Sequence, residues 1–248
     1  MRLLLPLIAL FAAASPALAQ QPEVPRWTVG ALVIDRDAPY RELDEDLLVV
    51  PLVRFEGERA YVRGLRGGVR LIQSPGYELA AFAQARMDGY DSKDSPFLAG
   101  MADRRASLDL GLESKWTSDK FGVLELSVAA DALDRSGGFE VAAGWTGLFR
   151  SGGWVFLPGA SLRWQDASMV DYYYGVRTAE ARLGRPAYSA DSAVTPELSL
   201  LATRALGERW NLFARAGHAW LPSQVKDSPL VDRNGSTSLL VGIGYALD

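Results

Sequence analysis

Residues 153–164 of the chain read GWVFLPGASLRW and alternate between two unlike sets of side chains. One set is apolar and runs from Trp154 to Trp164, and the other contains Ser161, Arg163 and small or aliphatic residues. An alternation of period two is typical of a β-strand with two different faces. The two tryptophans are ten residues apart, which is roughly 33 Å along a strand and about 25 Å once the strand is tilted by about 40°. This height is typical of the apolar band of an outer-membrane barrel, which has aromatic girdles at both water interfaces.

The same spacing recurs in two other segments. Phe139 and Phe149 bracket a second alternating apolar set, and Trp210 and Trp220 bracket a third. A soluble β-sandwich is the alternative, but it has no reason to repeat one distance between aromatic residues. We therefore predict that six aromatic residues form the two girdles of a transmembrane barrel: Phe139, Phe149, Trp154, Trp164, Trp210 and Trp220.

The first 19 residues have the pattern of a secretory signal peptide. Arg2 supplies the positive charge, residues 3–14 supply the apolar segment, and Ala17 and Ala19 are the small residues of a cleavage site. The apolar segment is too short to remain as a membrane helix. We predict cleavage after Ala19, with residues 1–19 as the signal peptide and residues 20–248 as one barrel domain.

Composition excludes several classes of protein. No later stretch approaches the roughly 18 uninterrupted apolar residues of a membrane-spanning helix. The chain contains no cysteine, which excludes disulfides, thiolate chemistry and a lipidated cysteine. The formal net charge is −4, so the chain lacks the strongly basic composition that is typical of nucleic-acid-binding proteins. A mean hydropathy of +0.01 suits a barrel, in which lipid-facing and lumen-facing residues average out.

Alternation and turn residues together predict an all-β, transmembrane, antiparallel, up-and-down barrel of twelve strands. The strands are expected at residues 27–34, 47–55, 59–63, 69–73, 77–87, 105–116, 120–130, 139–149, 153–164, 194–206, 209–220 and 236–247. The third and fourth of these are short for a membrane crossing, so ten strands is the alternative. Both numbers are even, as in bacterial outer-membrane barrels.

The connections between the predicted strands alternate in length. Tight connections are expected at residues 56–58, 74–76, 117–119, 150–152 and 207–208, and long ones at 35–46, 88–104, 131–138, 165–191 and 221–235. A connection at residues 64–67 is the exception to this order. Because outer-membrane barrels place short turns in the periplasm and long loops outside, the pattern predicts an orientation as well as a fold.

Several short motifs resemble the MipA/OmpV family of outer-membrane proteins. They are Tyr172-Tyr173-Tyr174-Gly175-Val176, Glu180, Trp210-Asn211-Leu212, Asp227-Ser228-Pro229-Leu230-Val231 and Gly242-Ile243-Gly244-Tyr245. The first half of the chain is similar through residues 59–68 and 98–101. The resemblance implies an outer-membrane barrel and marks residues 172–176 as a family-signature loop.

The resemblance also implies a scaffolding role. MipA-like proteins bridge a membrane-bound lytic transglycosylase and a bifunctional penicillin-binding protein in peptidoglycan synthesis, whereas other relatives are described as antigens or stress-linked proteins. The expected partners are therefore these two enzymes and outer-membrane lipid, without nucleic acid. The expected location is the cell outer membrane, reached by export through the periplasm.

Candidates for catalysis are few. The chain has one histidine, His218, so a Ser-His hydrolase would have to use it. Strand alternation predicts that the His218 side chain faces lipid. The sequence His218-Ala219-Trp220 also lacks the serine of the His-x-Ser motif of outer-membrane lipases. A metal site would need carboxylates alone, and Asp103, Asp109 and Glu113 are explained more simply as solvated or lumenal. We predict no enzyme activity and no catalytic, cofactor-binding or metal-binding residues, with lipid hydrolysis as the weakest hypothesis.

The predicted inward faces carry charges of both signs. They are Asp109, Glu113, Glu125, Glu140 and Glu197 together with Lys115, Arg163 and Arg215. These charges form either an ion-paired network that fills a narrow lumen or the wall of a polar pore. The tyrosines at 172–174 form either an exposed patch for a partner or a plug. The two main functional hypotheses are therefore a non-catalytic scaffold and a narrow diffusion channel.

Overall fold

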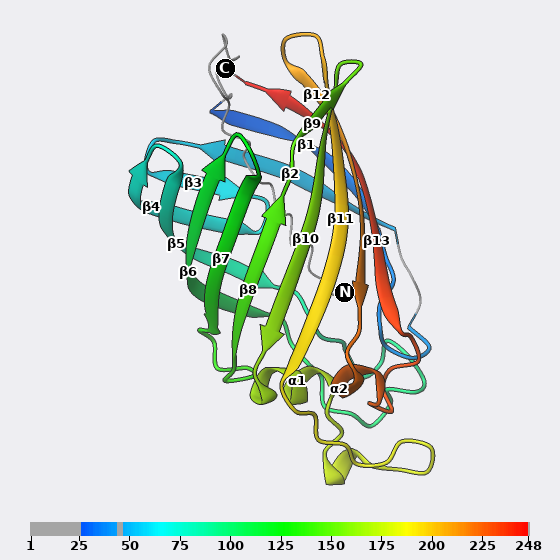
Figure 1. The fold of residues 1–248 in the computed structure, drawn as a ribbon. Coiled ribbons are helices and arrows are strands. Elements are labelled where there is room, and N and C mark those ends of the chain that lie inside the picture. The colour runs from blue at the N-terminus through cyan, green and yellow to red at the C-terminus, as the bar shows by residue number, and fades with distance from the viewer. Residues whose placement is uncertain (1–25, 44–46, 248) are drawn as a thin grey trace.

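A computed structural model describes residues 26–43 and 47–247 of the chain. They form one closed antiparallel barrel of twelve strands (Figure 1). The strands are β1 (Trp27–Arg36), β2 (Leu48–Glu56), β3 (Ala60–Arg63), β4 (Arg66–Ser74), β5 (Tyr77–Arg86), β6 (Ser107–Ser118), β7 (Gly122–Asp131), β8 (Phe139–Thr146), β9 (Phe149–Ser151), β10 (Trp154–Gln165), β11 (Ala193–Leu206), β12 (Trp210–Trp220) and β13 (Gly235–Ala246). Because β8 and β9 both pair with β10, they count as one strand interrupted at Gly147 and Leu148.

The first and last strands close the ring. β1 pairs with β13 from Thr28 opposite Ala246 to Arg36 opposite Ser238. Closure gives almost every strand a hydrogen-bonded neighbour on both sides, which is what a β-structure needs in order to span lipid. None of the helices in the described part of the chain has the length and apolarity to cross a membrane. The prediction of twelve strands rather than ten is confirmed.

The two faces of the strands differ as predicted. On β13, the outward Leu239, Val241 and Ile243 are between 40 % and 54 % exposed, whereas the inward Leu240 is 4 % exposed. On β12, Trp210 and Trp220 are exposed and Phe213 is buried. A one-residue change of register would place the apolar set in the lumen, so the alternation fixes the register of each strand.

The two ends of the barrel are built differently (Figure 1). One end has only tight turns between strands. The other end, which we call the cap, consists of residues 37–43, 87–106, 166–192 and 221–234 and contains α1 (Ala167–Tyr174), η1 (Thr178–Glu180) and α2 (Ser223–Lys226). Asp166 begins α1 as its N-cap by accepting a hydrogen bond from the Met169 amide.

A hydrophobic cluster of its own holds the cap together. Leu98 and Leu230 are 0 % exposed, and Val170 of α1 is 1 % exposed. Isolated bridges pair Tyr40 with Val231 and Tyr90 with Arg104, which ties separate loops to one another. The long connections are therefore a packed layer over one end of the barrel and not extended loops.

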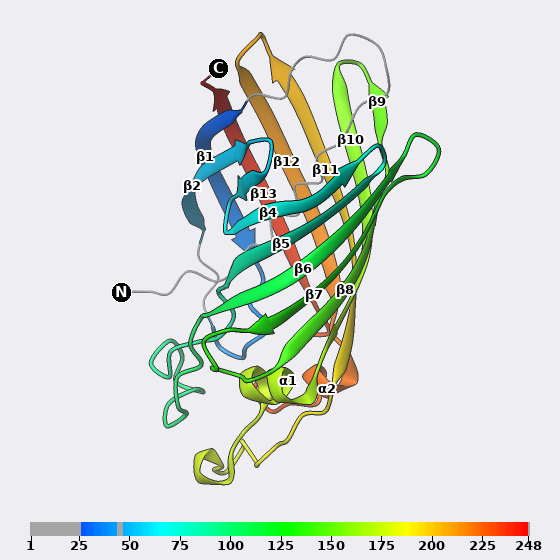
Figure 2. The same ribbon diagram turned by 90° about the vertical axis from the view of Figure 1, so that its left-hand side faces the viewer.

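The narrowest part of the wall is β3, which has only 4 residues. It pairs with β2 over three residues and with β4 over four, compared with eleven between β12 and β13 (Figure 2). Among the described residues, no strand pairs with residues 48–52 of β2 on the side away from β1. Pro51 lies on this free edge, where a residue without an amide hydrogen is tolerated. We call β2, β3 and β4 the seam.

Three sequence predictions need correction. The connection expected at residues 64–67 is a turn of two residues, Gly64 and Leu65, because β4 begins at Arg66 and includes Gly67 and Gly68. A Cβ atom on Gly68 would overlap the Tyr61 ring, so this glycine makes room for a side chain inside a strand. The single strand at 139–149 is divided into β8 and β9, and the predicted loops at 165–191 and 221–235 contain helices. The predicted signal peptide and its cleavage after Ala19 lie outside the described residues.

Candidate functional site: the barrel lumen and its cap

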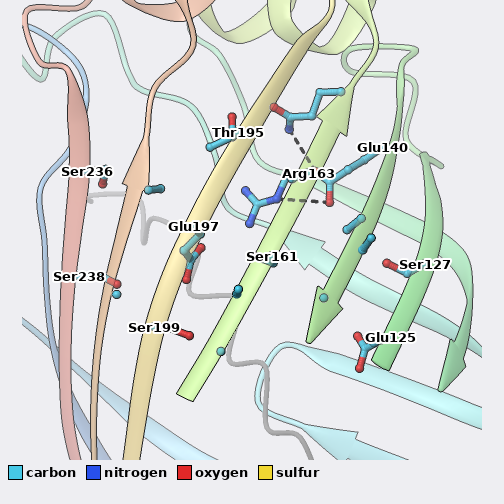
Figure 3. A pocket seen from close by; sticks show the side chains of 18 of the residues that line it. Glu125, Ser127, Glu140, Ser161, Arg163, Thr195, Glu197, Ser199, Ser236 and Ser238 are labelled. Atoms are coloured by element: carbon cyan, nitrogen blue, oxygen red, sulfur yellow. Dashed lines mark hydrogen bonds and ion pairs between the residues drawn. The ribbon is translucent and has the colours of Figure 1, made fainter. Parts of the chain in front are cut away.

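The lumen contains a cavity of about 180 Å³. Its wall is formed by side chains of β1, β4, β5, β7, β8, β10, β11, β12 and β13, part of which Figure 3 shows. Tyr173 and Tyr174 of α1 line its capped end. The alternation that turns apolar residues toward lipid turns serine, threonine and charged residues toward this space. The cavity is therefore lined by polar and charged groups together with apolar ones, whereas the barrel is apolar outside.

Two ion pairs project from neighbouring strands into the cavity. Arg163 of β10 has its Nε atom 3.7 Å from Glu140 of β8. Arg215 of β12 donates a hydrogen bond to Glu197 of β11. Each pair joins adjacent strands of the wall, because Arg163 lies opposite Ala142, two residues from Glu140, and Arg215 lies opposite Leu201. The charges predicted to face the lumen do so, and they are paired.

Arg86 at the end of β5 is paired with three carboxylates. One guanidinium nitrogen lies 2.6 Å from Asp109 and 3.1 Å from Glu140, and the other lies 3.2 Å from Asp88. Arg86 is 3 % exposed and Asp109 is 1 % exposed. A buried arginine with three carboxylates around it is stabilised in its charged form, since a buried charge needs a partner.

A second network closes the seam from the inside. Glu56 of β2 binds Arg63 of β3 at 2.7 Å and Arg70 of β4 at 2.6 Å. The Tyr61 hydroxyl of β3 donates to Glu113 of β6 at 2.8 Å, and Arg66 of β4 binds the same carboxylate at 2.6 Å. These side chains connect β2, β3, β4 and β6 where the backbone ladder is short.

The tyrosine run lies in α1 and closes the capped end of the lumen. Tyr173 is 2 % exposed and lines the cavity, and the Tyr174 ring stacks on Tyr40 with a centroid distance of 5.8 Å. Tyr172 accepts a hydrogen bond from the Arg105 amide at 3.0 Å. Gly175 ends the helix and Val176 bridges to Tyr188. The tyrosines at 172–174 therefore form a plug at the capped end of the lumen and not an exposed patch for a partner.

Glu180 locks the cap. Its carboxylate accepts hydrogen bonds from Arg104, at 2.9 Å, and from the amides of Ala102 and Arg177. Burial raises the pKa of this carboxyl, but the hydrogen bonds from Arg104 and the two amides outweigh burial and lower the pKa to about 2. Arg185 is 1 % exposed and donates to the Glu180 and Ala99 carbonyl groups. We call this set of bonds the lock; apart from the Arg177 amide, its partners are far from Glu180 in the chain, so the local sequence does not predict it.

The other predicted residues lie apart from the cavity. Phe149, Trp154 and Trp210 lie at the turn end of their strands, and Phe139, Trp164 and Trp220 at the capped end. All six are on the outer face of the barrel, and the Phe139 and Trp164 rings contact each other at a centroid distance of 5.2 Å. His218 is also on the outer face, where its Nδ1 lies 3.0 Å from the Thr237 hydroxyl.

The carboxylates considered for a metal site are dispersed. Asp103 lies in the cap and accepts a hydrogen bond from the Ser92 amide at 2.8 Å, whereas Asp109 and Glu113 are in separate lumenal ion pairs. Within residues 26–43 and 47–247, no group of three or more histidine, cysteine or carboxylate residues could hold a metal ion. Sequence reasoning missed the arginines of the seam, whose signal was the density of arginine between residues 54 and 70.

The amino-acid sequence is similar to known proteins along most of its length. The family described as "MltA-interacting protein MipA" matches residues 29–247. The chain is 32% identical to the putative outer membrane protein YiaT of Escherichia coli (strain K12), over 96% of this chain and 97% of YiaT. It is 30% identical to the MltA-interacting protein of the same strain, over 89% of this chain and 90% of that protein. A solved NanC porin structure has the same fold at 8% identity, with a TM-score of 0.50 over 88% of this chain and 100% of the porin.

The relatives are named as outer-membrane or interacting proteins and not as enzymes. Their location, together with a closed barrel whose outer face is apolar, makes this chain an outer-membrane protein. The match to the family covers all thirteen strand segments except the first two residues of β1. The chain therefore belongs to the MltA-interacting protein MipA family.

Proposed function

We propose that this protein is a non-catalytic scaffold of the outer membrane that holds peptidoglycan-degrading and peptidoglycan-synthesising enzymes at its turn end. The observation that carries the proposal is the 30% identity, over almost the whole chain, to a protein named for its interaction with MltA. The proposed partners are a membrane-bound lytic transglycosylase and a bifunctional penicillin-binding protein. The six girdle aromatics would anchor the barrel in outer-membrane lipid, with the short turns on the periplasmic side.

The geometry agrees with a docking function in two ways. Arg163, Arg215 and Arg86 are each paired with a lumenal carboxylate, so these charges hold neighbouring strands of the barrel together. The opposite end is closed by the cap, which leaves the turn end as the accessible periplasmic surface in this orientation. The β9–β10 hairpin there carries Arg150 and Ser151, which are both exposed.

Crosslinking from single cysteines tests this proposal, and the chain offers a cysteine-free background. Ser151→Cys, at the turn end, would carry a photoactivated crosslinker, and Leu183→Cys, which is 103 % exposed in the cap, would be the matched control. We expect the lytic transglycosylase to be captured in cells from position 151 and not from position 183. Capture from position 183 alone, or from neither position, would contradict docking at the turn end.

A narrow diffusion channel is the second candidate, and the polar cavity in the lumen favours it. Planar-bilayer recording of the reconstituted protein tests this function. Steady single-channel conductance would support a channel. Absence of conductance from correctly folded protein would contradict it and would mean that the cap closes the lumen.

A further inference from the structure

The cavity wall carries hydroxyl groups that have no hydrogen-bond partner among the residues that the structure describes. The side chains of Ser127 on β7, Ser161 on β10, and Thr195 and Ser199 on β11 all line the cavity (Figure 3). None of these four hydroxyls forms a hydrogen bond with another described residue. Ser161 lies opposite Glu197 and Ser199 lies opposite Gly159, so the hydroxyls on β10 and β11 are on neighbouring inward faces with the Glu197 carboxylate among them.

Two buried groups at the capped end are also unsatisfied. The Tyr173 hydroxyl has no hydrogen-bond partner although the residue is 2 % exposed and lines the cavity. The Nε atom of Arg86, which lines the same cavity, has no partner either. A buried polar group without a partner costs about 1–3 kcal/mol, so an ordered water or a bound molecule that supplies the missing hydrogen bond is stabilised at this end of the cavity.

The charges on the wall indicate what kind of molecule fits. Arg163 is paired with Glu140, Arg215 with Glu197, and Arg86 with Asp88. A charged ligand would have to break one of these pairs and leave its partner uncompensated, which costs free energy where the pair is partly buried. An uncharged hydroxyl both donates and accepts, so it can bond to serine, tyrosine and the outer atoms of an intact ion pair at once.

We propose that the lumen binds a small, uncharged, polyhydroxylated molecule with the chemistry of a monosaccharide. Ser161, Ser199 and Tyr173 would bond to its hydroxyl groups, and the aromatic rings of the cap would cover one side of it. At about 10–15 Å³ per water, the cavity of about 180 Å³ holds on the order of a dozen waters, which such a molecule would replace. This inference concerns the lumen and does not depend on the scaffold function at the turn end.

Binding of three matched sugars to the full-length protein in detergent micelles tests the proposal. D-glucose is the uncharged probe; D-glucuronate has a carboxylate in place of the C6 hydroxymethyl group, and D-glucosamine has an ammonium group in place of the C2 hydroxyl. We expect saturation-transfer NMR titrations to show binding of D-glucose and at least tenfold weaker binding of both charged sugars. Absence of D-glucose binding, or charged sugars that bind as well or better, would overturn the proposal.

Variants show whether the bound sugar occupies this cavity. Tyr173→Phe removes the buried hydroxyl alone, and Ser199→Ala removes one from the wall, so each should weaken D-glucose binding by about two- to tenfold. Tyr172→Phe is the matched control, since Tyr172 bonds to the Arg105 amide and is not part of the cavity wall. Heat-modifiable gel mobility verifies that each barrel is folded. Unchanged affinity in Ser199→Ala and in every folded Tyr173 variant would place the sugar elsewhere and overturn the assignment.

Discussion

At the scale of single residues, Glu180 decides how the cap responds to pH. Its pKa is lowered from 4.5 to about 2 in the folded cap. A carboxyl with a lowered pKa stabilises the folded state fully above its unfolded value, and this stabilisation is lost as the pH falls from about 4.5 towards 2. Glu180→Gln should therefore loosen the cap at neutral pH by on the order of 3 kcal/mol and remove most of its acid dependence between those values.

Limited trypsin digestion measures this loosening. Lys93 and Arg182 are exposed residues of the cap at which cleavage would be followed. We expect Glu180→Gln to be cut several times faster than the natural protein at pH 7.5, with the barrel strands protected in both. Asp191→Asn is the control, because Asp191 is an exposed carboxylate of the same cap. Equal digestion of the Glu180 and Asp191 variants would show that the lock does not hold the cap.

At the scale of elements, the seam depends on side chains because its backbone ladder is short. Glu56 is bound by Arg54, Arg63 and Arg70, at distances from 2.6 to 3.2 Å. Glu56→Gln would leave three arginines with one carboxylate fewer, and removal of one partner from a buried ion pair typically costs about 3–5 kcal/mol. We expect a clear fall in the urea midpoint of barrel unfolding, read by gel mobility without heating.

The control for the seam lies two residues away. Glu58 is exposed in the β2–β3 turn, so Glu58→Gln should leave the urea midpoint within the error of the wild-type value. If Glu56→Gln behaves like Glu58→Gln, the seam is held by its few backbone pairs and the network contributes nothing measurable.

The sequence could predict strands wherever the period of two was long enough. The segments with paired aromatics, such as β10 and β12, are close to their predicted bounds because the membrane imposes both an apolar face and a length. The strand bounds in the seam were predicted least accurately, because the sequence of Gly67 and Gly68 is typical of a turn. Gly68 is needed because the Tyr61 ring of β3 occupies the space beside it, and a local sequence pattern cannot indicate a contact with another strand.

The lumen was predictable as a set of inward charges but not as a set of pairs. Parity alone places Glu140 and Arg163 inside, and the neighbouring register then brings them together. The cap was not predictable, since its hydrophobic cluster joins residues from Tyr40 to Val231 that no short-range periodicity connects. The tyrosine run could be noticed in sequence, and only the fold distinguishes a plug from an exposed patch.

At the scale of the whole molecule, closure between β1 and β13 can be tested covalently. Ala31 and Ile243 are opposite each other on the outer face. Opposed residues of antiparallel strands have Cα atoms about 4.5–5.5 Å apart, which is within the range that a disulfide bridges. We expect Ala31→Cys combined with Ile243→Cys to form a disulfide on mild oxidation, seen as faster migration of the denatured, non-reduced chain.

The control for closure uses the same strands in the wrong register. Leu239 lies opposite Asp35, four residues from Ala31, so Ala31→Cys with Leu239→Cys should remain reduced under the same conditions. Efficient disulfide formation by this second pair, or by neither pair, would mean that the barrel does not close in the register described.

The shortness of β3 also determines how the barrel would tear under mechanical load. When a strand is pulled out of a barrel from one end, the force required rises with the number of paired residues that must break together. β2 and β3 share three such pairs and β12 and β13 share eleven. In single-molecule pulling from the C-terminus, the last hairpins should leave at high force, and extraction of β3 should give the lowest force peak of the trace.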